Sequence, residues 1–193
     1  MFFMGIDLGT SGVKVLLIDE KGDVVSKGEE EYPLYTPQPG WTEQDPQEWW
    51  SATQSAIKKA IRRINPGEIK GIGLTGQMHG SVFLDESGDV IRPCILWNDQ
   101  RTYREVEEIM ERFGDQVVNW IANPVLTGFT LPKIIWLKKN EPENFKRVRK
   151  ILLPKDFIRF KLTGEYATEV SDASGTALFN VKDRRWSQEM MDA

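Results

Sequence analysis

Short apolar runs separated by glycine and charged turns occupy the first part of the chain. Residues 2–6 and 13–18 are two such runs, and a polar stretch with two glycines at 9–12 separates them. A third, alternating segment extends from 24 to 32 after a charged turn. Runs of this length between turn residues are typical of β-strands. The pattern predicts an antiparallel meander of three strands.

A helical period replaces the strand pattern after this meander. Asp45 can cap a helix, and Pro46 suits its first turn. Apolar residues then recur every three or four positions over 49–64, which places them on one face of a helix. The same criteria predict further helices at 102–113, at 130–140, at 155–162 and from Ser187 onward.

Apolar strands alternate with these helices. The segment 69–74 is expected to be a buried strand, and 95–97 and 148–153 are expected to be strands too, whereas 171–176 is expected to be a loop. Because a helix separates the strand at 69–74 from the meander, the connection is a crossover, which produces a mixed sheet. The sequence therefore predicts the α/β class.

Composition narrows the class of partner. The 193 residues are 40% apolar, with 25 basic and 29 acidic side chains and a net charge of −4, so there is no broad basic field for nucleic acid. Cys94 is the only cysteine, which excludes an intrachain disulfide and a thiolate zinc site and favours the cytoplasm. No apolar run approaches the ~20 residues of a membrane span, so no membrane partner is expected. A small-molecule partner is favoured, and the oligomeric state stays open, a homodimer included.

The turn between the first two strands is one candidate site. Gly9 and Gly12 are expected to supply backbone conformations that other residues resist, and the N–H groups around Thr10 and Ser11 can converge on a phosphate. Asp7, where the strand ends, suits a Mg²⁺ ion or its waters. An ordinary glycine hairpin explains these residues equally well. The segment 5–14 matches neither G-x-x-x-x-G-K-[ST] nor G-x-G-x-x-G.

Polar residues also follow two later strands. Met78 and His79 follow the strand at 69–74, and Asp99 and Arg101 follow the next apolar strand. Ligands bind at the carboxyl ends of strands in α/β folds, and these groups suit the hydroxyls of a small polyol. Core packing of Met78, a structural hydrogen bond from His79, and a loop ion pair between Asp99 and Arg101 remain alternatives. With one histidine, a histidine-rich metal site is excluded.

Six segments together resemble the FGGY family of carbohydrate kinases, and within it the bacterial xylulose kinases. They are GIDLGTSGVK (5–14), WTEQDP (41–46), GQMHG (76–80), ILWNDQR (95–101), LPKD (153–156) and SDASGT (171–176). The first also resembles the phosphate hairpin of the actin-like ATPase superfamily. The implied fold is a ribonuclease-H-like domain of that superfamily, with a mixed sheet flanked by helices.

The resemblance implies transfer of the γ-phosphoryl group of ATP, with Mg²⁺, to the 5-hydroxyl of D-xylulose. It places Asp7 at the metal and in the catalytic site, on the phosphate side together with Gly9, Thr10 and Ser11. The residues that it implies for the sugar are Met78, His79, Asp99 and Arg101.

Family members are much longer than this chain. The resemblance therefore implies that residues 1–193 form an incomplete N-terminal sugar-kinase domain, with the ATP-binding C-terminal lobe and a general-base aspartate beyond Ala193. We expect the chain alone to transfer phosphate barely or not at all. The alternatives are a kinase for another sugar, such as ribulose, gluconate or a deoxyketose, and a non-catalytic sugar- or nucleotide-binding module.

Overall fold

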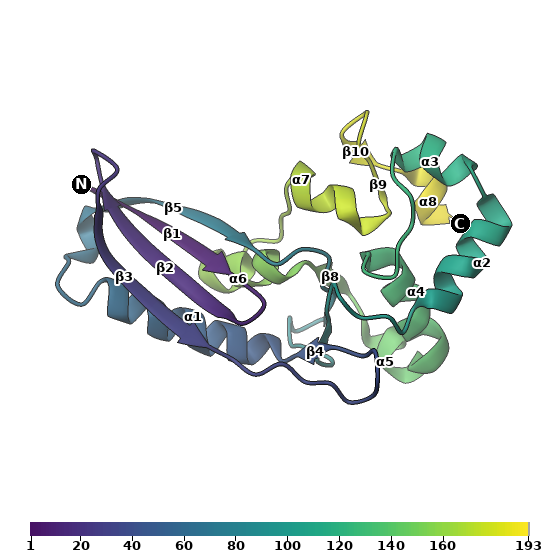
Figure 1. Ribbon diagram of the computed structural model, residues 1–193, viewed down its shortest axis with the longest axis horizontal. Helices are drawn as coiled ribbons and strands as arrows, with labels where there is room; N and C mark the ends of the chain where they lie inside the picture. The colour runs from purple at the N-terminus through teal and green to yellow at the C-terminus, as the bar shows by residue number, and fades with distance from the viewer. Residues whose placement is uncertain (193) are drawn as a thin grey trace.

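A four-stranded sheet forms one end of the molecule in the computed structural model, which describes residues 1–192 (Figure 1). Its strands are β1 (Phe2–Leu8), β2 (Gly12–Asp19), β3 (Val24–Glu31) and β5 (Ile69–Gly76). They lie in the order β3-β2-β1-β5, and β1 pairs antiparallel with β2 and parallel with β5. The predicted meander and mixed sheet are confirmed.

Helix α1 (Pro46–Ala60) covers one face of this sheet. Asp45 caps it as predicted, because its Oδ1 accepts a hydrogen bond from the N–H of Gln47 at 2.8 Å. The buried indole of Trp49 packs in the same core as the inward side chains of β1 and β2. The helix ends at Ala60 and not at residue 64, since Ile61 and Ile64 reach the core from a following turn.

The opposite face of the sheet is largely exposed. Phe3, Leu16 and Ile72 project from it and are 37%, 42% and 54% exposed. The prediction of a buried strand at 69–74 is therefore wrong: β5 is an edge strand of the described sheet, next to β1 alone. An apolar run does not distinguish a strand covered on both faces from one covered on a single face.

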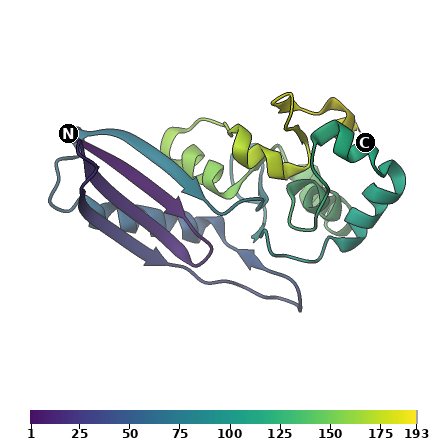
Figure 2. The same cartoon turned by 45° about the horizontal axis from the view of Figure 1, so that its top comes forward.

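Helices make up the other end of the molecule (Figures 1 and 2). They are α2 (Tyr103–Phe113), α3 (Gln116–Ile121), α4 (Thr130–Asn140), α5 (Pro142–Arg147), α7 (Val170–Ala173) and α8 (Gln188–Asp192). A second core, which includes Ile109, Ile121 and Met190, holds α2, α3 and α8 together. No helix within residues 1–192 is long and apolar enough to cross a membrane.

Two short strand pairs and one helix lie between the two ends, and a third strand pair, β9 (Phe179–Asn180) with β10 (Arg185–Trp186), lies at the helical end beside α3 (Figure 1). The first two pairs are β4 (Glu43–Gln44) with β7 (Cys94–Ile95), and β6 (Val82–Leu84) with β8 (Lys150–Leu152). Helix α6 (Pro154–Thr163) lies on the α1 side of the sheet, and 3₁₀ turns occupy Pro66–Glu68 and Ser174–Thr176.

The later elements are confirmed in part: β7 and β8 cover only part of the strands expected at 95–97 and 148–153, and the loop expected at 171–176 is wrong. Helices α2, α4, α6 and α8 lie where the periodicity placed them. The segment 171–176 is not a loop, because α7 and a 3₁₀ turn cover it. Glu169 caps α7 by accepting hydrogen bonds from the N–H groups of Ser171 and Asp172 at 2.7 and 2.8 Å. A glutamate cap is uncommon, which is why the pattern did not indicate this helix.

Candidate functional site

A row of polar side chains crosses the exposed face of the sheet where β1 and β2 meet. Asp7 pairs with Lys14 across β1 and β2 and with Thr75 across β1 and β5, and Lys14 pairs with Glu29 on β3. A hollow of about 700 Å³ lies over this row and the adjoining turn. Among the described residues, neither the Asp7 carboxylate nor the Lys14 ammonium has an ion-pair partner. Both charges are therefore available to a ligand.

Gly9 and Gly12 are required because the neighbouring backbone lies too close for a Cβ atom, and not because the turn needs an unusual backbone angle. Neither Gly9 nor Gly12 has a positive φ, so the expected conformational role is wrong. A Cβ on Gly12 would lie 2.5 Å from the carbonyl oxygen of Glu30 on the neighbouring strand. The N–H of Gly9 donates to the carbonyl oxygen of Gly12 at 3.0 Å. The N–H groups of Thr10 and Ser11 are thus the better candidates for a phosphate.

Three side chains from distant segments fix this turn. Tyr32 donates its hydroxyl to the carbonyl oxygen of Gly9, and burial followed by the charge of Asp7 raises the pKa of that tyrosine. Gln44 donates to the carbonyl oxygen of Thr10 at 2.7 Å, and the indole of Trp97 donates to its hydroxyl at 3.1 Å. Gln44 was not predicted as a site residue from the sequence, although it lies in the WTEQDP segment.

The segment after β5 meets the end of β1 directly. The N–H of Gln77 donates to the carbonyl oxygen of Leu8 at 2.7 Å, and its side chain donates to Gln44 Oε1 at 3.0 Å. Gln44 therefore contacts both the turn at 9–12 and the segment that carries Met78 and His79. The structure thus brings the end of β1 and the segment after β5 together.

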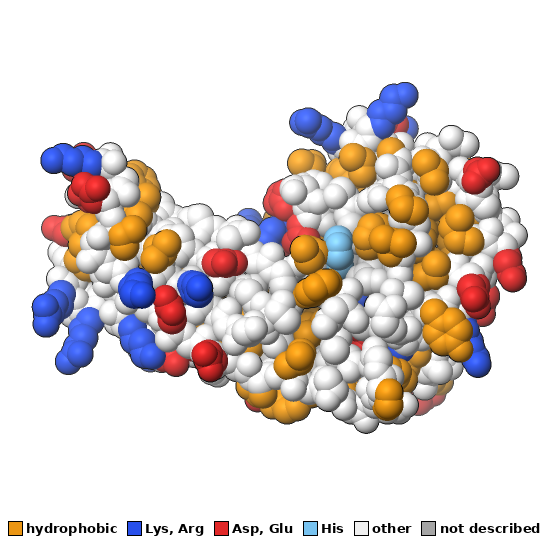
Figure 3. All heavy atoms as spheres, in the orientation of Figure 1, with side chains coloured by type: hydrophobic (Ala, Val, Ile, Leu, Met, Phe, Trp, Pro, Cys, Tyr) orange, Lys and Arg blue, Asp and Glu red, His pale blue; other side chains and the backbone are white. Residues whose placement is uncertain are grey.

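Met78 and His79 differ in their surroundings. Met78 is 45% exposed, so core packing does not explain it. His79 is half-buried, and its ring lies 4.8 Å from that of Phe129. A Cβ on Gly175 would fall 1.9 Å from His79 Cε1, so only a glycine leaves space for the imidazole. Figure 3 shows this histidine in pale blue beside the hollow between the two ends of the molecule.

The imidazole of His79 is neutral at physiological pH. The pKa of His79 is lowered to about 4, first by burial and second by the nearby charge of Lys133, while a hydrogen bond with the Gly175 backbone acts in the opposite direction. A neutral imidazole has one donor and one acceptor nitrogen, which suits a hydroxyl of a sugar.

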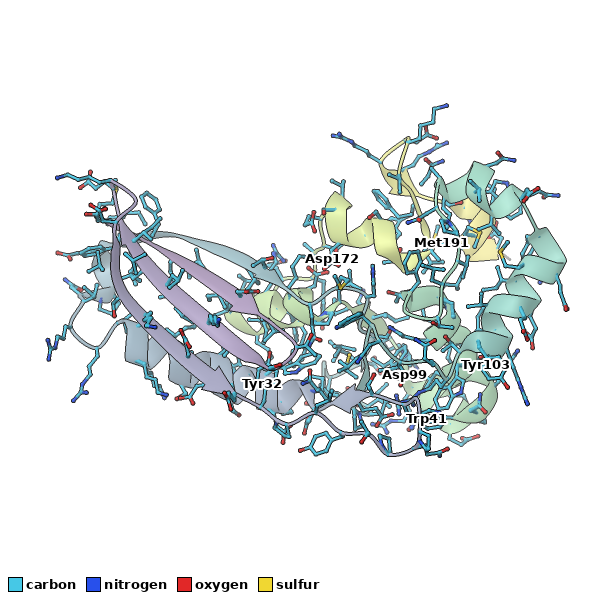
Figure 4. All side chains as sticks on the ribbon, viewed as in Figure 1. Tyr32, Trp41, Asp99, Tyr103, Asp172 and Met191 are labelled. Carbon is cyan, nitrogen blue, oxygen red and sulfur yellow. The ribbon has the colours of Figure 1, made fainter. Side chains whose placement is uncertain are left out.

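Asp99 and Arg101 are buried against each other instead of facing the hollow. Asp99 is 0% exposed and Arg101 is 6% exposed. The carboxylate accepts from Arg101 Nε at 2.9 Å and Nη2 at 2.8 Å, and from the N–H of Thr42 at 2.6 Å. The guanidinium lies 3.8 Å from the ring centre of Trp41 and 4.9 Å from that of Trp136, and Figure 4 shows Asp99 near Trp41. The ion pair is the alternative noted from the sequence, and a sugar contact by either residue stays a prediction.

An ion-pair cluster joins the segments 153–156 and 171–176 to each other. Lys155 Nζ lies 2.9 Å from Asp156 Oδ1 and 3.0 Å from Asp172 Oδ2. A Cβ on Gly80 would lie 2.6 Å from the ring of Pro154, so the segment 76–80 abuts the start of α6. Figure 4 shows Asp172 on the side of the hollow between the two ends of the molecule.

The exposed row fits a phosphate with a magnesium ion better than a metal bound by protein alone. No group of three or more histidine, cysteine or acidic side chains within residues 1–192 is arranged to hold a metal. Magnesium commonly keeps several waters and binds one or two carboxylates together with the phosphates of a substrate. The free carboxylate of Asp7 beside the free ammonium of Lys14 provides that combination.

Comparison with known proteins identifies close relatives. Residues 2–193 match the N-terminal domain of the FGGY family of carbohydrate kinases. The xylulose kinase of Staphylococcus xylosus is 46% identical over 191 residues, which cover 98% of this chain and 40% of that protein. This chain therefore spans about 40% of the length of the curated relatives that it matches.

Two solved structures share the fold. A xylulose kinase from Brucella ovis has a TM-score of 0.94 and 47% identity, over 100% of this chain and 40% of that chain. A gluconate kinase from Lactobacillus acidophilus has a TM-score of 0.92 and 30% identity, over 99% of this chain and 39% of that one. The predicted actin-like ATPase fold is confirmed. With the sequence match extending over residues 2–193, the chain belongs to the FGGY family of carbohydrate kinases.

Proposed function

We propose that this chain is the N-terminal domain of a kinase that transfers the γ-phosphoryl group of ATP to D-xylulose and forms D-xylulose 5-phosphate and ADP. The main support is the direct contact between the strand that carries Asp7 and the segment that carries Met78 and His79. In this contact the N–H of Gln77 donates to the Leu8 carbonyl oxygen at 2.7 Å. Phosphoryl transfer depends chiefly on placing the two reactants together. The extent of the domain, the cytoplasmic location and a homodimer belong to this proposal as predictions.

On the phosphate side, Asp7 would hold the magnesium ion or its waters. When bound, that ion supplies charge neutralisation for the transferring phosphoryl group. Lys14, which the sequence analysis did not select, would contact a phosphate oxygen from the neighbouring strand. The N–H groups of Thr10 and Ser11 would donate to phosphate at the turn that Gly9 shapes.

On the sugar side, Met78 and His79 would contact the ketose. The neutral imidazole of His79 can orient one hydroxyl, and the exposed thioether of Met78 can cover an apolar edge of the sugar. The attacking hydroxyl must also lose its proton. We propose that an aspartate outside the residues of this chain accepts it, and that the chain alone is therefore almost inactive.

A kinase for another sugar is the second candidate. The gluconate kinase of Lactobacillus acidophilus has the same fold at 30% identity, and a few pocket side chains decide between similar sugars.

Coupled ADP release by the full-length protein tests the proposal, with D-xylulose, ribulose and gluconate as substrates. We expect turnover on D-xylulose that falls at least about tenfold in His79→Ala, because the hydroxyl that His79 orients loses its partner. Lys138→Ala, on the surface of α4, is the control. Turnover only on another sugar would show that D-xylulose is not the substrate. An absence of sugar-dependent ADP release would contradict the proposal that the protein is a kinase.

A further inference from the structure

The turn that presents His79 is strained. Its φ is +62°, and the N–H of Gly80 donates to the carbonyl oxygen of Met78 at 2.7 Å, which closes a three-residue turn around it. A γ-turn with a positive φ at a residue other than glycine is rare. Such a conformation persists only where the surroundings hold it.

A buried lysine from α4 holds the carbonyl group of this turn. Lys133 Nζ donates to the carbonyl oxygen of His79 at 2.9 Å and to that of Gly128 at 2.6 Å. The hydroxyl of Thr130 donates to the same His79 oxygen at 3.3 Å. Lys133 is 0% exposed, and among residues 1–192 no carboxylate forms an ion pair with it. Lysine is rarely buried without such a pair, so these carbonyls are its main partners.

The surroundings of Lys133 favour an uncharged amine that donates hydrogen bonds over a charged ammonium group. His79, Cys94, Asp99 and Arg101 are the titratable groups that face it, and burial lowers the pKa of Lys133 to about 7. An uncharged amine has two N–H groups, one for each of the two carbonyl oxygens. The protonated amine can donate to both as well. Lys133 can therefore donate to the carbonyl oxygen of His79 in either protonation state.

We propose that Lys133 is a positioning residue, which fixes the backbone turn that presents Met78 and His79 to the sugar. This inference rests on the proposed function and adds a residue that touches neither reactant. Without the amine, the His79 carbonyl would be buried with a single weak donor, and the turn would relax toward negative φ. The imidazole would then leave its place between Phe129 and Gly175. The loss would appear in sugar binding and not in ATP binding.

Steady-state kinetics of the full-length protein test whether Lys133 affects sugar binding and not ATP binding. Lys133→Met keeps the length of the side chain and removes its donors. We expect the KM for D-xylulose to rise about tenfold while the KM for ATP changes less than about twofold. Lys138→Met on the exposed side of the same helix is the matched control and should change neither. Equal changes in both KM values would indicate general damage and overturn the inference.

A second readout does not depend on catalysis. In full-length protein labelled with ¹⁵N-histidine, with His79→Gln used to assign the signal, the imidazole should titrate near pH 4. In Lys133→Met it should titrate at higher pH, because a charge is lost and the ring becomes more hydrated. An unchanged titration would contradict the inference. If the wild-type protein phosphorylates no sugar, the proposed function fails, and this titration still decides the role of Lys133.

Thr130→Val covers the case in which Lys133→Met does not fold. It removes only the longer of the two hydrogen bonds to the His79 carbonyl and leaves the lysine in place. We expect a rise of about threefold in the KM for D-xylulose, in the same direction and again without a change for ATP. A wild-type KM for D-xylulose in this variant, together with an unchanged His79 titration, would overturn the inference.

Discussion

The phosphate-side turn and the sugar-side turn lie next to each other but are built differently. The first joins two regular strands, with no positive φ at Gly9 or Gly12, and displays Asp7 and Lys14 on an exposed sheet face. The second contains a strained His79 whose carbonyl is held by Lys133, 54 residues away in the chain. Regular pairing suffices to align Asp7 with Lys14, the charges that we propose for the phosphate. The imidazole that we propose for the sugar is fixed by support from a second part of the fold.

Replacement of Asp7 should give the largest effect and should be confined to the phosphate side. In full-length Asp7→Asn we expect kcat to fall by about a hundredfold or more, because one group that stabilises developing charge is lost. The KM for D-xylulose should stay within about twofold of wild type. Steady-state kinetics measure both. A large rise in the KM for D-xylulose with normal kcat would remove the distinction between the two turns.

Replacement of Gly175 should damage only the sugar side. In Gly175→Ala the new Cβ would meet the imidazole of His79 at 1.9 Å, so the ring must move. We expect a rise of about tenfold in the KM for D-xylulose and little change for ATP. Gly67→Ala, whose Cβ would lie 3.4 Å from its nearest neighbour, is the control. Normal sugar kinetics in Gly175→Ala would show that the ring position is unimportant.

Substitution of Gly12 in the turn at 9–12 should destabilise the protein through a steric clash and not through a restricted backbone angle. In Gly12→Ala the Cβ would lie 2.5 Å from the Glu30 oxygen, so β2 and β3 must separate. We expect the free energy of unfolding to fall by about 1–3 kcal/mol, as in other overpacked sites. Gly5→Ala, on β1 with no heavy atom within 4 Å of its Cβ, should lose almost none. Urea unfolding of both variants compares them directly.

The smallest expected effect is a pH dependence of stability from the sugar side. The folded-state pKa of His79 is about 4, below its ordinary value of 6.5. The unfolded chain therefore binds a proton first as pH falls, so stability is lost between about pH 6.5 and pH 4. His79→Gln should lack this part of the decline in its thermal unfolding midpoint. Parallel pH profiles for the two proteins would show that His79 does not contribute.

Much of the fold was predictable because its signals are local. Alternating side chains marked β1 to β3, and Asp45 with Pro46 marked the start of α1. The order of the segments located the strand ends that form the site. Short elements such as α3 and α5 were missed because helices of 6 residues show less than two full turns of periodicity.

The environment of Asp99 and Arg101 could not be predicted from local sequence patterns. From the sequence, both a sugar contact and a loop ion pair fitted the same two residues. The structure buries them, with Trp41 and Trp136 beside the guanidinium. Those two indoles come from segments far apart in the chain, so no local pattern indicates that they meet.

The sequence by itself determined the α/β class, the phosphate-side turn and the segments that carry Met78 and His79. Strand alternation and helix capping act between residues a few positions apart, and a linear pattern records them. Only the tertiary structure decided the strained turn at His79, its support by Lys133 and the space left by Gly175. These depend on atoms that close packing brings together from distant parts of the chain, and their directions are set by the whole fold.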